Sequence, residues 1–234
     1  MLDKLIYDIR ILKNPQKATL LQRYFKTGKG EYAEGDKFLG LTVPICRQIS
    51  KKNKDLSLSD LKELLKSRYH EERLIALLIL VSQFGKNQKK IFDFYLSSTK
   101  YINNWDLVDL TAPKIVGQYL YHLKDADIRS KQLKKLATSN NLWQRRIAVL
   151  ATFYFIHENH FDESLQIAKM LLQDRHDLIH KAIGWMLREV GKRDQNVEEI
   201  FLRKYYQKMP RTMLRYAIEK FPDSLRRFYL ARST

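Results

Sequence analysis

The fold is decided by RLIALLILVSQF (residues 73–84). Its apolar residues recur at the spacing of an α-helix, as they do in IAVLATFYFI (147–156) and KAIGWMLREV (181–190). No stretch alternates apolar and polar residues convincingly over several strands. The chain has 8 glycines and 5 prolines among 234 residues, which is little material for many tight turns. The sequence therefore predicts an all-α protein.

A small residue recurs about every 35 positions along these helices. The positions, separated by 36, 36, 34 and 35 residues, are Ala76, Ala112, Ala148, Ala182 and Ala217. Four places after each lie Leu80, Val116, Thr152, Met186 and Phe221, and eight places after lie Phe84, Leu120, Ile156, Val190 and Leu225. A small side chain lets a neighbouring helix approach, and the stripe beside it can be buried. This period predicts an α-solenoid of paired helices, which usually binds its partner on a concave face.

The intervening segments supply the second helix of each pair. We expect these helices at Leu58–Ser67, Lys89–Ser97, Ala126–Ala137, Phe161–Leu172 and Val197–Lys208. Asp125, Asn140 and Asp194 have the character of helix starts. Four glycines gather in residues 27–40, which we expect to form the one clear loop. We expect a single repeat domain over 1–234, with N-terminal helices in 1–52 and repeats over about 56–230.

The charge is strongly positive. Lys and Arg total 43 against 26 Asp and Glu, a net +17, and the surplus is spread through the chain. Such a surplus favours a long basic surface for nucleic acid over a merely cation-rich soluble surface. Cys46 is the only cysteine, which excludes an internal disulfide and a cysteine-based zinc site. With no signal peptide or membrane span in evidence, we expect a cytoplasmic protein.

Two acidic residues in the segment 103–110 have different interpretations. Asn103 or Asn104 can cap a helix there, and Asp106 then lies in its first turn, where the helix dipole favours a carboxylate. Asp109 lies past the first turn between apolar residues, so it must be paired with an arginine or face a wet, functional cleft. Trp105 is four residues away on the same face, and an indole beside a carboxylate is suited to a cation.

Two further repeated helices carry candidate residues. Trp143 is expected to pack between repeats, while one of Arg145 and Arg146 can reach a neighbouring helix and the other a concave face. Trp185 follows Gly184 in mid-helix, where glycine costs about 1 kcal/mol. Close approach of a backbone or a ligand would explain this glycine, and the alternative is a tolerated glycine beside a buried tryptophan.

The histidines do not indicate a metal site. His157 and His160 are three apart and His176 and His180 are four apart, but neither pair has a third ligand nearby in the sequence. We therefore expect no metal and no cofactor. The chain also has no Gly-x-Ser-x-Gly nucleophile elbow.

Three separated motifs make the chain resemble the AlkD-like DNA glycosylases, bacterial alkylation-repair proteins built from HEAT-like repeats. They are WDLVD (105–109), NLWQRR (141–146) and KAIGWMLRE (181–189). RYFK (23–26) and FLGLTVPICRQ (38–48) resemble the family's N-terminal segment, whereas residues 27–37 are longer and more acidic than is usual. The resemblance covers nearly the whole chain and implies HEAT-like helix pairs around a concave basic cleft.

The resemblance also implies an activity. The family releases positively charged alkylated purines, N7-alkylguanine and N3-alkyladenine, from double-stranded DNA without cutting the strand. The matching catalytic residues would be Asp109, Trp105 and Trp185. The DNA-binding residues would be Arg146 and Tyr24, with Lys181 and Arg188 and with Arg145 as the alternative to Arg146. We expect a monomer whose partner is DNA that carries alkylated bases.

Two other functions fit the sequence. One is a non-catalytic solenoid that binds damaged or branched DNA, which the basic surplus alone would support. The other is a protein-binding scaffold, which would lack a steeply salt-dependent affinity for duplex DNA.

Overall fold

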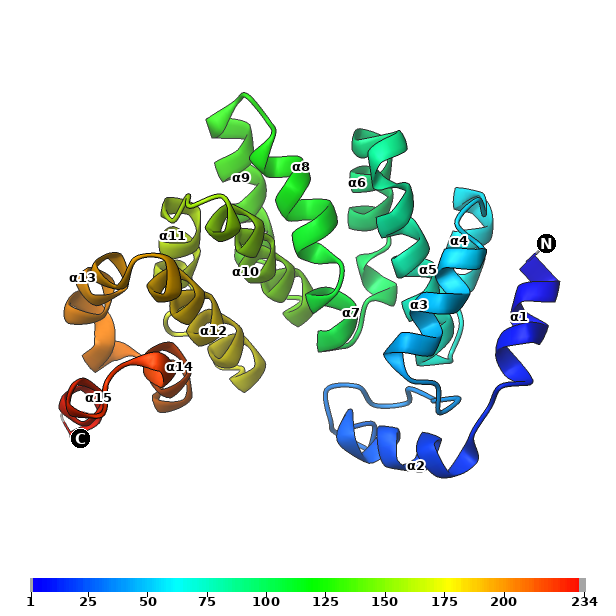
Figure 1. Cartoon of the computed structure of the whole chain (residues 1–234), viewed down its shortest axis with the longest axis horizontal. Coiled ribbons are helices and arrows are strands. Elements are labelled where there is room, and N and C mark those ends of the chain that lie inside the picture. Colours follow the sequence, from blue (N-terminus) through cyan, green and yellow to red (C-terminus); the bar gives the residue numbers. More distant parts are fainter. Residues whose placement is uncertain (1, 232–234) are drawn as a thin grey trace. The chain divides into compact units, whose positions relative to one another are not determined.

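The computed structural model describes residues 2–231 (Figure 1). Over this part of the chain the fold is all-α, and an isolated bridge between Lys37 and Tyr69 is its only β-type pairing. The chain divides into two compact units, Met1–Thr111 and Ala112–Thr234. The expectation of a single domain stays a prediction, and each unit is described by itself.

The first unit contains seven α-helices among its described residues. They are α1 (Leu2–Arg10), α2 (Pro15–Tyr24), α3 (Val43–Lys52), α4 (Leu58–Leu65), α5 (His70–Gln83), α6 (Gln88–Ser97) and α7 (Trp105–Asp109). Helix α5 is the centre of this unit, because both α3 and α4 pack against it. Its residues from His70 to Leu77 are all buried. Residues 27–40 form no helix or named strand, so the predicted loop is confirmed.

The second unit continues the pairing of helices. It contains a π-helix (Pro113–Gly117), α8 (Gln118–Tyr121), α9 (Ala126–Ala137), α10 (Leu142–His157), α11 (Asp162–Met170), α12 (Asp177–Arg193), α13 (Gln195–Tyr205), α14 (Arg211–Ala217) and α15 (Asp223–Ala231). Helix α10 packs against α9, α11 and α12, and α12 packs against α13 and α14. A repeated helix therefore contacts both its own partner and the next repeated helix.

The repeated alanines lie where the period predicts. Each of the five has at most 1% of its surface exposed. The residues four places later are also buried, including Thr152, whose hydroxyl donates to the Val149 carbonyl. The absence of a large side chain at these points lets the helices approach closely, and the neighbouring stripe supplies apolar area to bury.

Three predicted helix boundaries need correction. The cap of α10 is Asn141 and not Asn140, since the Asn141 side chain accepts from the backbone N–H groups of Trp143 and Gln144. The helix expected through Ala112 is interrupted, because Pro113 has no N–H to continue the ladder after α7. Leu225 lies in α15 rather than in the helix of Ala217. The cause is Pro222, which restricts the residue before it to an extended conformation.

The other two predicted starts are confirmed. The Asp125 carboxylate accepts from Asp127 and Ile128 at the start of α9, and the Asp194 carboxylate accepts from Asn196 and Val197 at the start of α13. Each cap satisfies two backbone donors that the helix leaves unpaired, which stabilises the helix by about 1 kcal/mol.

One buried carboxyl group in α13 is a local weakness. Glu198 is 1% exposed, and its Oε1 has no hydrogen-bond partner among the described residues. Burial raises the pKa of Glu198 to about 9, with a smaller contribution from Glu199. The folded state therefore keeps a proton that the unfolded chain loses near pH 4.5. Stability must fall as the pH rises from that value towards 9.

Replacing Glu198 with glutamine is expected to raise the melting temperature at pH 8 and to change it little at pH 5. Glutamine carries no proton that must be retained, so the stabilisation should grow with pH. Thermal melts at the two pH values measure this effect. Glu63→Gln, at an exposed ion pair with Lys66, is the control. An equal shift at both pH values would contradict the protonated state of Glu198.

Candidate nucleic-acid interface

Trp105 opens α7 and lies within a cluster of aromatic rings. The Asn104 side chain accepts from the Trp105 backbone N–H at 2.8 Å and caps the helix. The Phe25 ring is stacked on the indole, with centroids 5.2 Å apart, and the Tyr24 ring meets it edge-on at 6.0 Å. Tyr24 is 64% exposed and the indole is half-buried. The first unit therefore brings two predicted site residues, Tyr24 and Trp105, into contact.

Asp109 ends the same helix, one turn after Trp105. Its side chain is half-buried, between the buried Val108 and the partly exposed Leu110. Its negative charge contributes to raising the pKa of Tyr95, although burial of that phenol is the larger cause. Asp109 thus lies at the margin of the buried core of the unit, on the helix face that also carries the indole.

A buried ionic network supports α7 from inside the first unit. The Nε2 atom of His70 lies 2.8 Å from an Asp106 carboxylate oxygen, and its Nδ1 atom lies 3.6 Å from Asp36. Asp36 also accepts from Arg73 at 2.7 Å and from Asn103 at 2.7 Å. Asp106 is a structural residue in the first turn of α7, as predicted. The sequence did not predict that its partner is His70.

His70 is protonated at neutral pH. Burial alone lowers its pKa, but the charge and hydrogen bond of Asp106 outweigh burial and raise the pKa to about 9. Asp36 behaves in the complementary way: burial raises its pKa, but the hydrogen bond to His70 and the charge of Arg73 lower it overall. The network therefore consists of two carboxylates, an imidazolium and a guanidinium that neutralise one another.

The sequence did not predict the roles of His70, Arg73 and Asp36 in this network. A signal exists in HEER (70–73), four polar residues that directly precede the apolar run of α5 and are nevertheless at most 4% exposed. Charged residues are almost never this buried unless they are paired. The charged partners of His70 and Arg73, Asp106 and Asp36, lie 36 and 37 residues away in the chain, so these ion pairs leave no local pattern.

The two adjacent arginines of α10 have different partners in the second unit. Arg145 donates to Asp174, with 2.6 Å between Nε and the carboxylate, and to the carbonyls of Ser139 and Asn140. Arg146 is 5% exposed, and its Nη1 donates to the Leu178 carbonyl in the first turn of α12. Arg146 is thereby held against the helix that carries Trp185.

Trp185 is half-buried on α12. Its Nε1 donates to Glu189 at 3.1 Å, and its ring lies 5.6 Å from Phe153 of α10. Two predicted basic residues lie on the same helix. Lys181 pairs with Asp177 at 2.7 Å, and the guanidinium of Arg188 donates to Glu219. Both basic side chains are half-buried.

Gly184 is explained by the backbone of α14. A Cβ atom at Gly184 would lie 2.4 Å from the Met213 carbonyl oxygen and 2.5 Å from Cβ of Tyr216. The predicted close approach is therefore confirmed, and the approaching group is a backbone rather than a ligand. Gly117 has the same role against Ala151, with a distance of 2.3 Å to its carbonyl oxygen.

Replacing Gly184 with alanine is expected to destabilise the protein by about 1 to 3 kcal/mol, because two backbones must separate. Replacing glycine with alanine in a helix interior normally increases the free energy of unfolding by about 1 kcal/mol. At Gly184 we expect the opposite, a decrease in the free energy of unfolding. Urea unfolding measures the difference. Gly85→Ala is the matched control, because a Cβ there meets nothing within 4 Å. A more stable Gly184→Ala protein would contradict the close packing of α12 and α14.

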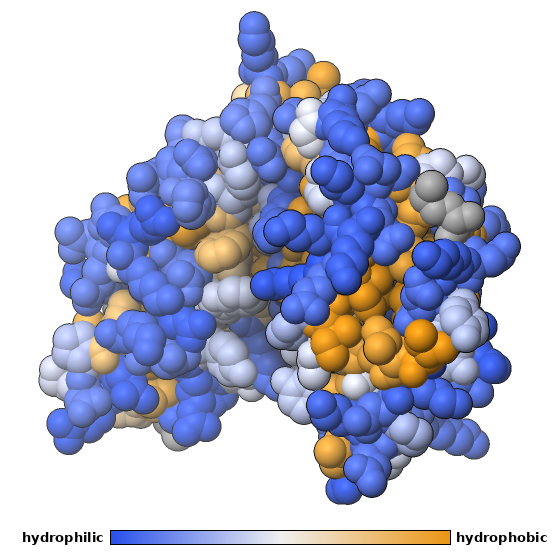
Figure 2. All heavy atoms as spheres, turned by 45° about the vertical axis from the view of Figure 1, so that its right-hand side comes forward, coloured by the Kyte–Doolittle hydropathy of each residue, from blue (hydrophilic) through white to orange (hydrophobic). Residues whose placement is uncertain are grey.

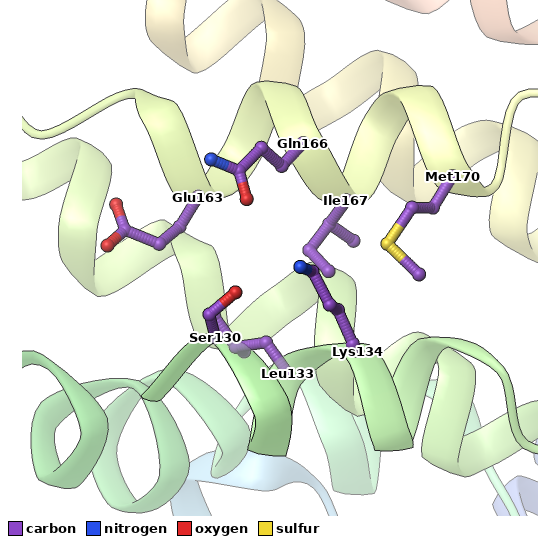
Figure 3. A pocket seen from close by; sticks show the side chains of 7 residues that line it. All are labelled: Ser130, Leu133, Lys134, Glu163, Gln166, Ile167 and Met170. Atoms are coloured by element: carbon purple, nitrogen blue, oxygen red, sulfur yellow. The ribbon is translucent and has the colours of Figure 1, made fainter. Parts of the chain in front are cut away.

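A shallow pocket lies between α9 and α11 (Figure 3). Ser130 and Lys134 face it from α9, and Glu163, Gln166 and Met170 face it from α11. None of the predicted site residues lines this pocket. Figure 2 shows that hydrophilic residues cover most of the face in view, which fits a chain in which 29% of residues are charged.

The comparisons with known proteins identify the family. A family model described as DNA alkylation repair enzyme matches residues 6–221, and the chain belongs to this family. A solved protein from Enterococcus faecalis, described as a predicted DNA alkylation repair enzyme, has the same fold. Its TM-score is 0.70 at 17% identity, over 90% of this chain and 97% of that one. No curated protein matches the chain.

Among residues 2–231, no group of three or more His, Cys, Asp and Glu side chains is arranged to hold a metal ion. None of the described helices combines the length and hydropathy that crossing a membrane requires.

Proposed function

We propose that this member of the alkylation-repair family is a monofunctional DNA glycosylase. It hydrolyses the N-glycosidic bond of positively charged N7-alkylguanine and N3-alkyladenine in double-stranded DNA and leaves the strand uncut. The observation that carries the proposal is the α7 helix, where two half-buried residues, Trp105 and Asp109, lie one turn apart on one face. An aromatic plane beside an anion is suited to a cationic group.

The chemistry needs electrostatic help rather than a nucleophilic side chain. When the bond between C1′ and the base nitrogen breaks, its electron pair neutralises the positive charge of the alkylated purine. The sugar is left as an oxocarbenium-like cation. Asp109 stabilises this cation and orients a water molecule, which adds to C1′ and loses a proton to the solvent. An abasic site and a free alkylpurine result.

The remaining predicted residues hold the DNA. Tyr24, Trp105 and Trp185 pack against the lesion nucleotide and its backbone. Lys181 and Arg188 contact phosphates, as does Arg146. Arg145 is the alternative for the last contact, but a phosphate would have to compete with its ion pair to Asp174 and its two carbonyl acceptors.

Product analysis tests this proposal. Duplex DNA methylated at N7 of guanine is incubated with the protein, and the free purine and the length of the strand are measured. We expect 7-methylguanine to be released faster than by spontaneous loss, with a strand that breaks only after treatment with alkali. Release together with strand cleavage would show a different reaction, and no release with intact DNA binding would select the non-catalytic alternative.

A titration at two salt concentrations separates DNA-binding functions from a protein scaffold. Each phosphate contact releases counterions, so affinity for duplex DNA should fall steeply between 50 and 200 mM salt, by about 10-fold or more if several basic residues bind phosphates. An affinity that is weak and insensitive to salt would favour the scaffold.

A further inference from the structure

The indole N–H group of Trp185 has an acceptor on its own helix. Its Nε1 atom donates to Oε1 of Glu189 at 3.1 Å. Glu189 lies four residues further along α12, on the same face, and helical side chains lean towards the N-terminus of their helix. The Glu189 carboxylate therefore reaches back to the indole, and its side chain is only 16% exposed. Glu189 is not among the predicted site residues.

The Glu189 carboxylate is itself held by two cations. The ammonium group of Lys192 donates to the same Oε1 atom at 2.7 Å, and Nε of Arg188 lies 3.8 Å away. Arg188 in turn donates to Glu219, in the short helix Ile218–Lys220. Charge-assisted contacts of this kind are stronger than neutral ones. The acceptor of the indole N–H is therefore kept in place by neighbours that also neutralise its charge.

The backbone that carries Trp185 is fixed by packing. Helix α12 packs against α10 and α14 (Figure 1), and Gly184 lies so close to α14 that a Cβ there would be 2.4 Å from the Met213 carbonyl oxygen. The direction of the indole thus depends on its own side-chain torsions, of which the second is broad for aromatic residues. The Phe153 ring lies beside the indole at 5.6 Å, with the planes inclined by 45°. The hydrogen bond to Glu189 is the contact that selects the direction of the N–H edge.

We propose that Glu189 is a positioning residue for Trp185. Its carboxylate holds the N–H edge of the indole, so that the aromatic plane meets the lesion nucleotide in one orientation. This inference rests on the proposed function for its consequence in the reaction. The positioning itself is a property of the free protein and can be measured without DNA.

Two neutral variants separate the acceptor from the negative charge. Glu189→Gln keeps an oxygen acceptor at the same place, whereas Glu189→Met has a similar length but only a weak acceptor in its sulfur. Both replacements are good helix formers, so α12 should be preserved in each. Both remove the same charge, and the effect of that charge on affinity for DNA phosphates should be the same in each. A difference between the two variants therefore reports the hydrogen bond.

NMR of the indole N–H groups tests the hydrogen bond. The chain has 3 tryptophans, so protein carrying ¹⁵N-labelled tryptophan gives one indole peak for each. The Trp185 peak is the one absent from Trp185→Phe. In Glu189→Met we expect the Trp185 proton to move upfield and to exchange faster with water, because it has lost the bond that protects it. In Glu189→Gln it should stay close to its original position. An unmoved Trp185 proton in Glu189→Met would overturn the hydrogen bond.

Nuclear Overhauser contacts between the rings of Trp185 and Phe153 test the orientation. These contacts should weaken in Glu189→Met, because the indole samples other rotations, and persist in Glu189→Gln. Contacts of the original strength in Glu189→Met would overturn the positioning.

Single-turnover release of 7-methylguanine tests the consequence for the reaction. We expect Glu189→Met to release the base about three- to tenfold more slowly than Glu189→Gln, the effect of one hydrogen bond, with the duplex affinities of the two variants within about twofold of each other. Equal rates, or a difference confined to affinity, would overturn the role of Glu189 in the reaction. If the original protein releases no base, the proposed function fails while the NMR measurements still decide the positioning.

Discussion

Replacing Asp109 with asparagine is expected to slow release of 7-methylguanine about 100-fold or more, the loss typical of a preorganised group that faces developing charge. Asparagine has the same shape but no negative charge, so it cannot stabilise an oxocarbenium-like sugar. Single-turnover release from a methylated duplex measures the rate.

Two further measurements show that this loss concerns the reaction. Affinity for the same duplex should change little, because Asp109 is proposed to act on the sugar cation rather than on a phosphate. Asp93→Asn is the control, since that carboxylate is exposed on α6, where it pairs with Lys89. An unchanged rate in Asp109→Asn would remove the carboxylate from the proposed mechanism.

Replacing His70 with glutamine is expected to destabilise the protein by about 3 to 5 kcal/mol at pH 6, because the buried Asp106 carboxylate loses its counter-charge. Glutamine is about as long as histidine and keeps a hydrogen-bond donor, so packing changes least. Denaturant unfolding measures the free energy.

The pH dependence identifies the imidazolium as the cause. His70 has a folded pKa of about 9 against 6.5 in the unfolded chain. The stability that it contributes is therefore fully present below pH 6.5 and lost as the pH rises through 9. The difference between the original protein and His70→Gln should shrink over this range. His157→Gln, at a 69% exposed side chain, should show no such difference. A constant difference from pH 6 to 9 would mean that packing alone is responsible.

The helical framework was predictable because its signals are local. A helix needs a small or apolar residue at a fixed spacing and a cap at its start, and both appear within a few positions of sequence. Ala148 and Ala182 are buried where the period places them, and Asp125 and Asp194 cap the helices they precede. The Gly184 contact was predictable as a close approach, although the sequence left open whether a backbone or a ligand would fill it.

The buried contacts that support α7 and the segment 27–40 were not predictable, because they join residues that are far apart in the sequence. Asp106 meets His70 across 36 residues, and Glu71 accepts from N–H groups that are 30 to 32 residues away. Helical periodicity contains no information about such pairs. The roles of Asp109, Trp185 and Arg146 in the reaction stay predictions.

The most direct measurement compares a charged and a neutral base in the same duplex sequence. One duplex carries 7-methylguanine, whose ring is cationic. A second duplex of the same sequence carries hypoxanthine, which is neutral, at the same position. Electrostatic stabilisation by Asp109 without a general acid predicts rapid release of 7-methylguanine and no detectable release of hypoxanthine. Equal release of both bases, or release of 7-methylguanine no faster than its spontaneous loss, would contradict the central claim.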